Sequence, residues 1–204
     1  MLSLRLKTIA SLVKKDAHVL DIGTDHAYLP IFLQKNNLCE KVIASDISPN
    51  ALANAKANIE KYHCDIKLYL SDGLNDIDDE YNTIIISGMG TLNICNILKD
   101  RDLPNDIIIS SNNNMYELRS FMNKLGYTIS KEIIVKDMGK YYDIIAYEKG
   151  SEKLNDTILK FGKSNNKEYY KYLYDKELEI YKGLNFKNKL KKKHNLNILK
   201  KLSS

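Results

Sequence analysis

Short apolar runs alternate with helix-spaced apolar positions along the first 150 residues of the chain. Residues 18–22, 41–46, 66–70, 83–87 and 106–111 have the length and apolar content of buried strands. Helical spacing marks a first segment with Leu6, Ile9, Ala10 and Val13 on one face, and then about 28–36, 49–62, 91–99 and 115–125. Two longer runs, 127–136 and 140–148, flank the hairpin-type connection Asp137-Met138-Gly139. Five βα-type repeats and a hairpin predict an α/β fold with a mostly parallel sheet and an antiparallel edge.

The pattern changes after Gly150. Residues 151–204 contain no strand signal and show only helical spacing, as in Tyr170, Tyr174, Leu178, Tyr181 and Leu184. Gly183 is expected to break this helix, and Phe186, Leu190, Leu199 and Leu202 continue the spacing in a second one. We therefore expect two domains, an α/β domain over 1–150 and a small all-α domain over 151–204. The tyrosines are expected to form its core rather than a base-stacking platform.

Charge is distributed unevenly between these two parts. The chain has a net charge of +5, but residues 1–150 carry 17 Lys and Arg against 20 Asp and Glu, whereas residues 151–204 carry 14 against 6. A mildly acidic body with a basic tail indicates a polyanionic partner held largely by the tail. The alternative is a solvated, lysine-rich helix face.

Several classes of protein are excluded by composition. No run approaches eighteen apolar residues, so no transmembrane helix is expected. The first fifteen residues alternate charged and apolar groups, unlike a signal peptide. The three cysteines lie far apart and form neither a disulfide framework nor a metal-ligand pattern, which indicates a reducing, cytoplasmic setting.

Acidic residues end three consecutive predicted strands. Asp21-Ile22-Gly23 ends the first, Asp46 the second and Asp72-Gly73 follows the third. The carboxyl edge of an open α/β sheet is where ligands bind, and Asp46 is placed to accept hydrogen bonds from ribose hydroxyls. Asp72 could accept from the exocyclic amine of an adenine or cap the next turn. The absence of Gly-x-Gly-x-x-Gly favours S-adenosylmethionine over a dinucleotide, and a methyltransferase over a dehydrogenase.

The fourth and fifth predicted strands end in small and amide residues. Ser87-Gly88-Met89-Gly90 stands where methyltransferases place acceptor-facing residues, and its glycines leave room for a flat base or form a tight turn. Asn112 can bond donor and acceptor atoms on an adenine edge, although asparagine is also a common helix cap.

These segments resemble one enzyme family. DIGTDHAYLP, SDIS, SDGL, SGMG, ELRSFMNKLGYTISKE and GKYYDI occur in the order and spacing of the bacterial tRNA (adenine(22)-N1)-methyltransferase family, over about residues 1–150. The resemblance implies a Rossmann-like domain that binds S-adenosylmethionine, a coiled-coil-like helical C-terminal domain, and tRNA as substrate. The chain departs from the family where Ser110-Ser111-Asn112 replaces Gln-Pro-Asn, which leaves Asn112 as the residue to carry over.

The expected site residues fall into three groups. Asp25 and Asn112 are the catalytic candidates. The cofactor is expected to contact Asp21, Gly23, Thr24, His26, Asp46, Ile47, Asp72, Gly73, Ser87 and Gly88. The substrate is expected to contact Met89, Gly90, Asn112, Arg5, Lys187, Lys191 and Lys192. No metal site is signalled, and we expect a monomer.

Two side chains of the first loop have open alternatives. Asp25 either faces the adenine, where a carboxylate stabilises the cationic base formed by N1 methylation, or binds the ammonium group of the cofactor. His26 contacts either ligand or packs beneath the following helix. The function expected is therefore methylation of adenine N1 in tRNA. The alternatives are methylation of another RNA or a small molecule, and a non-catalytic RNA-binding protein on the same fold.

Overall fold

The chain folds into two compact units, Met1–Phe161 and Gly162–Ser204. The computed structural model describes residues 2–204, except for the side chains of residues 186, 187, 190 and 191. Each unit has its own helices and its own buried residues.

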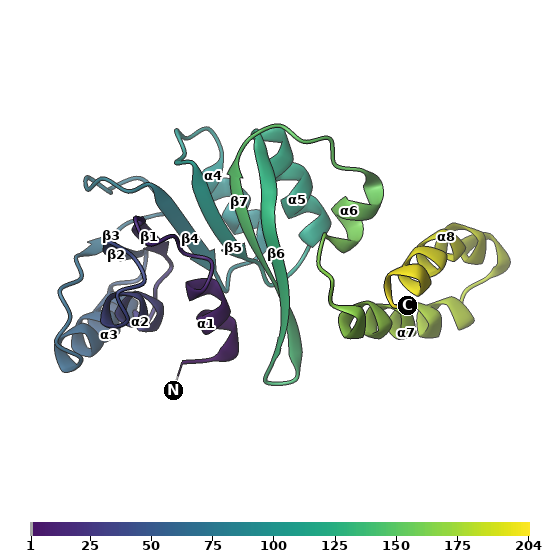
Figure 1. The fold of residues 1–204 in the computed structure, drawn as a ribbon, viewed down its shortest axis with the longest axis horizontal. Coiled ribbons are helices and arrows are strands. Elements are labelled where there is room, and N and C mark those ends of the chain that lie inside the picture. The colour runs from purple at the N-terminus through teal and green to yellow at the C-terminus, as the bar shows by residue number, and fades with distance from the viewer. Residues whose placement is uncertain (1) are drawn as a thin grey trace. The chain divides into compact units, whose positions relative to one another are not determined.

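A seven-stranded sheet forms the centre of the first unit (Figure 1), in the order β3-β2-β1-β4-β5-β7-β6. The strands are β1 (His18–Ile22), β2 (Lys41–Asp46), β3 (Leu68–Leu70), β4 (Thr83–Ser87), β5 (Asp106–Ser110), β6 (Tyr127–Asp137) and β7 (Lys140–Lys149). The first five pair in parallel, while β7 runs antiparallel to both β5 and β6. The predicted α/β class, with its antiparallel terminal hairpin, is confirmed.

Helices cover both faces of this sheet. Helices α1 (Leu4–Ala10), α2 (Tyr28–Lys35) and α3 (Pro49–Lys61) supply apolar residues to one buried cluster, and α4 (Thr91–Leu98), α5 (Met115–Lys124) and α6 (Asp156–Phe161) to the other. Successive strand residues point to opposite faces, so Ile85 packs in the first cluster and Ile84 and Ile86 in the second. Burial on both faces explains the continuous apolar runs that predicted these strands.

Two local features depart from the regular pattern of repeats. The third repeat has no helix, because β3 is followed by turns and irregular chain over residues 71–82 before β4 begins. Helix α6 was not predicted as a separate element. It is only six residues long, which is too short for a periodic signal.

A buried ionic cluster attaches α6 to the sheet. The Arg119 guanidinium lies 2.5 Å from Glu132 Oε1 and 3.2 Å from Asp143 Oδ1, and its Nη1 donates to the Leu159 carbonyl at 3.1 Å. Burial lowers the pKa of Arg119, but the two carboxylates outweigh burial and raise it. Arg119 is therefore charged, and it joins α5, β6, β7 and α6. No sequence pattern indicated this cluster.

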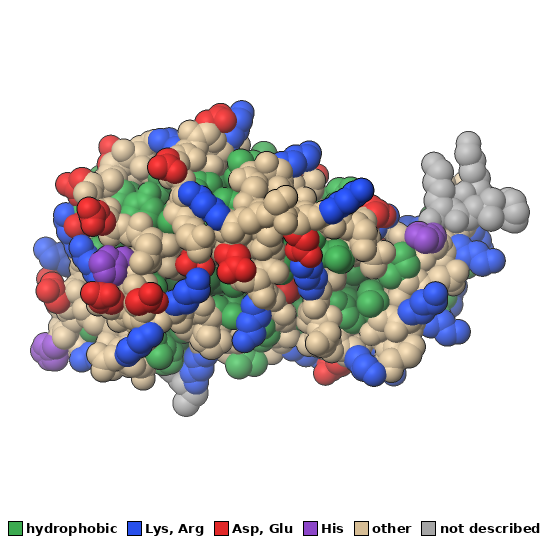
Figure 2. Space-filling view, turned by 45° about the horizontal axis from the view of Figure 1, so that its top comes forward, with side chains coloured by type: hydrophobic (Ala, Val, Ile, Leu, Met, Phe, Trp, Pro, Cys, Tyr) green, Lys and Arg blue, Asp and Glu red, His purple; other side chains and the backbone are tan. Residues whose placement is uncertain are grey.

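The second unit contains helices α7 (Lys167–Lys182) and α8 (Phe186–Leu202), which pack against each other. Asn166 and Asn185 cap their N-termini through side-chain oxygens, and Gly183 ends α7 as predicted. Tyr170 is buried and donates to the Ser164 carbonyl at 2.7 Å, which agrees with a core role for that tyrosine. Tyr172, by contrast, is exposed. Lys and Arg side chains are spread over the visible face of this unit (Figure 2).

Candidate active site

The loops that follow β1, β2 and β4 meet at the carboxyl edge of the sheet. Ile22 of β1 pairs with Ser45 of β2 on one side and with Ile86 of β4 on the other. The residues that come next in the three strands, Gly23, Asp46 and Ser87, therefore lie beside one another. The N–H groups of Gly23 and Thr24 both donate to the Ser45 carbonyl, at 2.9 and 3.0 Å. The end of β2 therefore holds the loop that follows β1, which we call the first loop, at the sheet edge.

A cleft of about 600 Å³ lies on the β3 side of this edge; we call it the larger cleft. It is lined by Ile22, Gly23, Asp46, Ile47, Ser71, Asp72, Gly73, Leu74, Asn75, Ser87, Gly88, Met89, Asn93, Asn96, Ile97 and Arg101. The structure thus brings together the predicted acids at the ends of β2 and β3. The residues from α4 and Arg101 were missed, because only strand ends were searched for ligand contacts.

Asp46 is fixed by backbone donors. Its Oδ1 accepts the Ser48 N–H at 2.9 Å and its Oδ2 accepts the Asp25 N–H at 3.0 Å. Each carboxylate oxygen keeps a second lone pair, so Asp46 can still accept from a vicinal diol. Asp46 thereby orders the loops after β1 and β2 and remains available to a ligand.

Beyond Asp46 the larger cleft suits a flat heterocycle. The Ile47 side chain is 65% exposed on its rim, and Gly73 has a φ of +65° with Ile97 close by, so that a Cβ at Gly73 would lie 3.2 Å from Ile97. Asp72 is exposed in the cleft, and no hydrogen bond to its carboxylate occurs within the described chain, so it does not cap the next turn. Apolar side chains beside an exposed carboxylate match the faces and the amino edge of an adenine.

A second, smaller cleft of about 370 Å³ adjoins the first; it is lined by Arg5, Leu6, Asp21, Gly23, Thr24, Asp25, His26, Tyr28, Leu29, Ser87 and Gly88. The two clefts share Gly23, Ser87 and Gly88. At their junction the Met89 methyl lies against Gly23, where a Cβ would be 2.2 Å from Met89 Cε. A side chain at position 23 would therefore collide with Met89 where the two clefts meet.

The first loop has an unusual backbone. Gly23, Asp25 and Ala27 have φ values of +75°, +50° and +54°. Only glycine adopts this region freely, so the other two residues carry strain that the surrounding contacts maintain. In this conformation Asp25 directs its N–H to Asp46, while its side chain is 67% exposed and lines the smaller cleft.

His26 is part of the cleft wall. Its Nε2 lies 3.5 Å from Asp25 Oδ2, and its ring stacks on Tyr28 with centroids 5.2 Å apart. The imidazole is partly exposed to the cleft and also packs on the first residue of the following helix, so both alternatives for His26 stay open. Tyr28 itself was missed, although it directly follows the Asp-His-Ala segment.

Asp21 points into the smaller cleft because strand alternation directs it to the α1–α2 face. Burial raises the pKa of Asp21 from its ordinary 3.8 to about 6; the nearby Thr24 hydroxyl opposes this rise and the Asp46 charge adds to it. The carboxyl is 5% exposed. Its protonation therefore changes closer to neutral pH than that of an ordinary carboxyl group.

The loops after β4 and β5 are joined by hydrogen bonds. Gly88 donates its N–H to the Ser110 carbonyl at 3.0 Å, and Asn112 donates its own N–H to the Met89 carbonyl at 2.9 Å and its Nδ2 to the Gly88 carbonyl at 2.6 Å. Asn112 therefore holds the Gly88–Met89 turn in place. Its exposed amide still has an acceptor oxygen and a second donor hydrogen.

Ser111 and Asn113 reinforce the same turn, and the sequence prediction missed both. Asn113 Oδ1 accepts the Thr91 N–H at 3.0 Å and so caps α4, because Gly90 at the N-cap has no side chain. The hydroxyls of Thr91 and Ser111 lie 2.8 Å apart. These bonds stiffen the loop that lacks the family's proline, while the buried Ser110 hydroxyl has no partner within the described residues.

The remaining predicted residues are placed as follows. Arg5 lines the smaller cleft from α1, with its guanidinium 5.0 Å from the centre of the Tyr142 ring. Gly90 begins α4 beside the Asn113 amide. Lys192 pairs with Glu177 at 2.6 Å inside the second unit. The Lys187 and Lys191 side chains lie outside the described residues.

Two kinds of feature are absent from the described part of the chain. In it, no group of three His, Cys, Asp or Glu side chains could hold a metal ion. No helix of that part is long and apolar enough to cross a bilayer.

Comparison with known proteins gives a consistent result. Residues 2–145 match the family model described as "Methyltransferase domain". A Mycoplasma genitalium protein with a provisional description as a tRNA methyltransferase is 35% identical over 153 residues, which cover 71% of this chain and 69% of the relative. The Bacillus subtilis tRNA (adenine(22)-N(1))-methyltransferase is 33% identical over 156 residues, covering 73% of this chain and 66% of the relative.

Solved structures extend the likeness to the whole chain. The M. capricolum TrmK complex with S-adenosyl-homocysteine has a TM-score of 0.85 at 30% identity, covering 98% of this chain and 97% of that one. The B. subtilis m1A22 tRNA methyltransferase TrmK has a TM-score of 0.81 at 27% identity, covering 100% and 99%. With its two joined clefts and the methyltransferase match over residues 2–145, the chain belongs to the tRNA (adenine(22)-N1)-methyltransferase family of S-adenosylmethionine-dependent enzymes.

Proposed function

We propose that the protein transfers the methyl group of S-adenosylmethionine to N1 of an adenine in tRNA, and that this adenine is nucleotide 22. The observation that carries the proposal is the junction at Gly23 and Gly88. There a cleft suited to an adenosyl group opens into a second one lined by the exposed Asp25 carboxylate. A donor in the first cleft can thus reach an acceptor in the second.

The residues of the larger cleft fit the cofactor. Asp46 would hold the ribose hydroxyls, Asp72 the exocyclic amine, and Ile47 and Gly73 the faces and edge of the adenine. The methionine part would pass Gly23, where a Cβ would block the way, and extend along Thr24, Ser87 and Gly88 toward Asp21. Bound there, S-adenosylmethionine supplies an electrophilic methyl group.

The chain's own residues would then orient and neutralise the acceptor. The N1 lone pair of adenine would bond to the methyl carbon as the bond from that carbon to the sulfonium sulfur breaks, which would leave S-adenosylhomocysteine and a cationic base. The Asp25 carboxylate would stabilise the charge that develops on the base and could accept a proton from N6. Asn112 would bond the adenine edge, next to the backbone of Met89 and Gly90. His26 and Arg5 line the smaller cleft, where Asp25 also lies.

We further propose that the basic C-terminal region contacts tRNA phosphates. Residues 151–204 carry 14 Lys and Arg against 6 Asp and Glu, which favours a polyanion. Lys187, Lys191 and Lys192 are the candidates, and Lys192 would have to exchange its Glu177 partner for a phosphate. We also propose a monomer that works in the cytoplasm, where its substrate is present.

Methylation of tRNA tests the function directly. Purified protein is incubated with S-adenosylmethionine and unmodified tRNA, and the nucleosides are analysed by mass spectrometry after digestion. We expect 1-methyladenosine among the nucleosides of the treated tRNA and not among those of untreated tRNA. Cofactor binding without transfer to any RNA would favour the non-catalytic alternative, and transfer to small molecules but not tRNA would favour the second enzyme class.

A truncation at the boundary between the two units tests whether the tail contributes to tRNA binding. Removal of residues 162–204 leaves α6 and its contact with Arg119 intact, whereas a cut at residue 150 would remove the Leu159 carbonyl. We expect weaker tRNA binding and unchanged S-adenosylmethionine binding by calorimetry. Unchanged tRNA affinity would contradict the role of the tail.

A further inference from the structure

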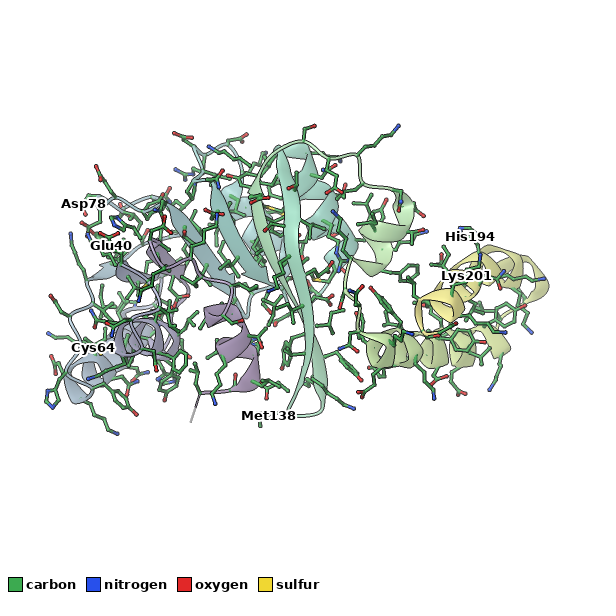
Figure 3. The ribbon with its side chains drawn as sticks, viewed as in Figure 1. Glu40, Cys64, Asp78, Met138, His194 and Lys201 are labelled. Atoms are coloured by element: carbon green, nitrogen blue, oxygen red, sulfur yellow. The ribbon has the colours of Figure 1, made fainter. Side chains whose placement is uncertain are left out.

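The hairpin of β6 and β7 extends past the active-site edge of the sheet. The last β5 residue paired with β7 is Ile109, opposite Ile145, so residues 140–143 run on beyond the end of β5. At about 3.3 Å per residue this extension reaches roughly 13 Å. Figure 1 shows the hairpin tip beyond the neighbouring strands, and Figure 3 shows Met138 at that tip.

The tip carries an apolar side chain where a turn prefers a polar one. Met138 and Gly139 have φ values of +47° and +80°, as in a two-residue type I′ turn. Asparagine, aspartate and glycine are favoured at such positions, and methionine there is strained. Met138 is nevertheless 93% exposed, so it contributes nothing to the core. Neither turn geometry nor packing accounts for a methionine at this position.

The tip is connected to the smaller cleft through Arg5. Asp137 Oδ2 accepts the Arg5 N–H at 3.0 Å, next to Met138. The Arg5 guanidinium lies over Tyr142 of β7, and a Cβ at Gly88 would be 3.8 Å from its nitrogens. The hairpin tip, Arg5 and the floor of the cleft are therefore successive parts of one surface.

Exposed cations flank the methionine. Lys136 and Lys140 stand on either side of the turn, with Lys136 lying over the Tyr141 ring, and the nearby Asp137 already accepts a bond from α1. Phosphates are drawn to such cations, and methionine is among the apolar side chains that proteins insert between base steps. Because N1 lies on the pairing edge of adenine, the target base must leave its stack before it can react.

We propose that the β6–β7 tip is an RNA wedge: Met138 inserts beside the target adenine of the tRNA and helps to unstack it, while Lys136 and Lys140 hold the adjacent phosphates. This inference rests on the proposed function, since it takes tRNA as the substrate. In this proposal, a segment that lies outside both clefts exposes the target base.

The decisive variant is Met138→Asn, because asparagine suits the turn and removes only the apolar side chain. We expect a melting temperature that is unchanged or raised, unchanged S-adenosylmethionine affinity, about tenfold lower kcat/KM on folded tRNA, and unchanged kcat/KM on a short unstructured RNA with an unpaired adenine. Met138→Leu should keep most of the activity. Wild-type kcat/KM on folded tRNA, or equal losses on both RNAs, would overturn the wedge.

A second measurement separates the wedge from the methyl transfer. In tRNA with 2-aminopurine at the target position, binding of wild-type protein should raise the 2-aminopurine fluorescence, and binding of Met138→Asn should not.

The two lysines are tested by the salt dependence of tRNA binding. Lys136→Ala and Lys140→Ala should each weaken binding and reduce the slope of log K against log salt concentration by about one, whereas Lys99→Ala, at the far end of α4, should not.

Failure of the proposed function would look different from failure of the wedge. If wild-type protein binds tRNA without methylating it, the function fails, while a fluorescence rise that depends on Met138 still supports the wedge. If binding raises the fluorescence equally with and without Met138, the wedge is overturned whatever the activity.

Discussion

The two clefts at the carboxyl edge of the sheet are built in different ways. The larger one is formed mainly by successive strand ends and α4, so that Asp46 and Asp72 reach it through the register of parallel strands. The smaller one is closed by side chains from α1 and the strained first loop, with Arg5 held in turn against the β6–β7 hairpin. We therefore expect substitutions in the larger cleft to act mainly on cofactor affinity, and substitution of Asp25 in the smaller cleft to act mainly on kcat.

The largest effect is expected in the smaller cleft. Asp25→Asn should lower kcat by about 10²- to 10³-fold, because the carboxylate that stabilises the cationic base is lost, and should leave cofactor affinity nearly unchanged. Rates and calorimetry together measure both quantities. Asp100→Asn is a matched control, since Asp100 is also an exposed aspartate with positive φ. A parallel collapse of cofactor affinity would instead make Asp25 a cofactor ligand.

Asp21 should make stability depend on pH. Its pKa of about 6 lies above the unfolded value near 3.9, so the folded state holds the proton more tightly. Relative to Asp21→Asn, the wild-type free energy of unfolding should fall by about 3 kcal/mol in total as pH rises from about 3 to about 7, with about 2 kcal/mol of this lost between pH 4 and 6, and then stay level. Denaturant unfolding of both proteins at several pH values measures this difference. A constant difference across that range would mean that Asp21 ionises normally.

In the larger cleft, Asp46→Asn should act mainly on cofactor binding. The substitution replaces one of the two charged acceptors for the ribose hydroxyls by an amide donor, at about 2 kcal/mol, or roughly thirtyfold in cofactor Kd. Titration calorimetry gives the Kd, and kcat at saturating cofactor should change only a few-fold. A loss in kcat as large as that for Asp25→Asn would show that the two clefts do not act separately.

The smallest effect concerns the loop that joins the clefts. Asn113→Ala removes the cap of α4 and should lower the free energy of unfolding by about 1 kcal/mol. Asn114→Gly is the control, since Asn114 makes no side-chain capping bond and its φ of +50° suits glycine. Thermal unfolding compares the two variants. Equal melting temperatures would mean that the Asn113 bond adds nothing.

Prediction succeeded where the signal was local. The strands and the acids at their ends followed from apolar runs, because a strand buried on both faces must be continuously apolar and its last residue reaches the sheet edge. Asn113 as a cap for α4, and the Arg119 cluster, were not predictable in this way. Their partners lie 22 residues away for Thr91 and 24 for Asp143, and no short motif encodes such distances.

The sequence by itself determined the fold class, the order of the elements and the family, since hydrophobic periodicity and the strand-end motifs are properties of short segments. Only the tertiary structure decided that Asp25 turns its backbone to Asp46 and its side chain to the smaller cleft, and that Arg5 bridges this cleft and the hairpin. These outcomes depend on φ angles and on contacts between residues up to 132 positions apart, and chain folding alone brings such residues together.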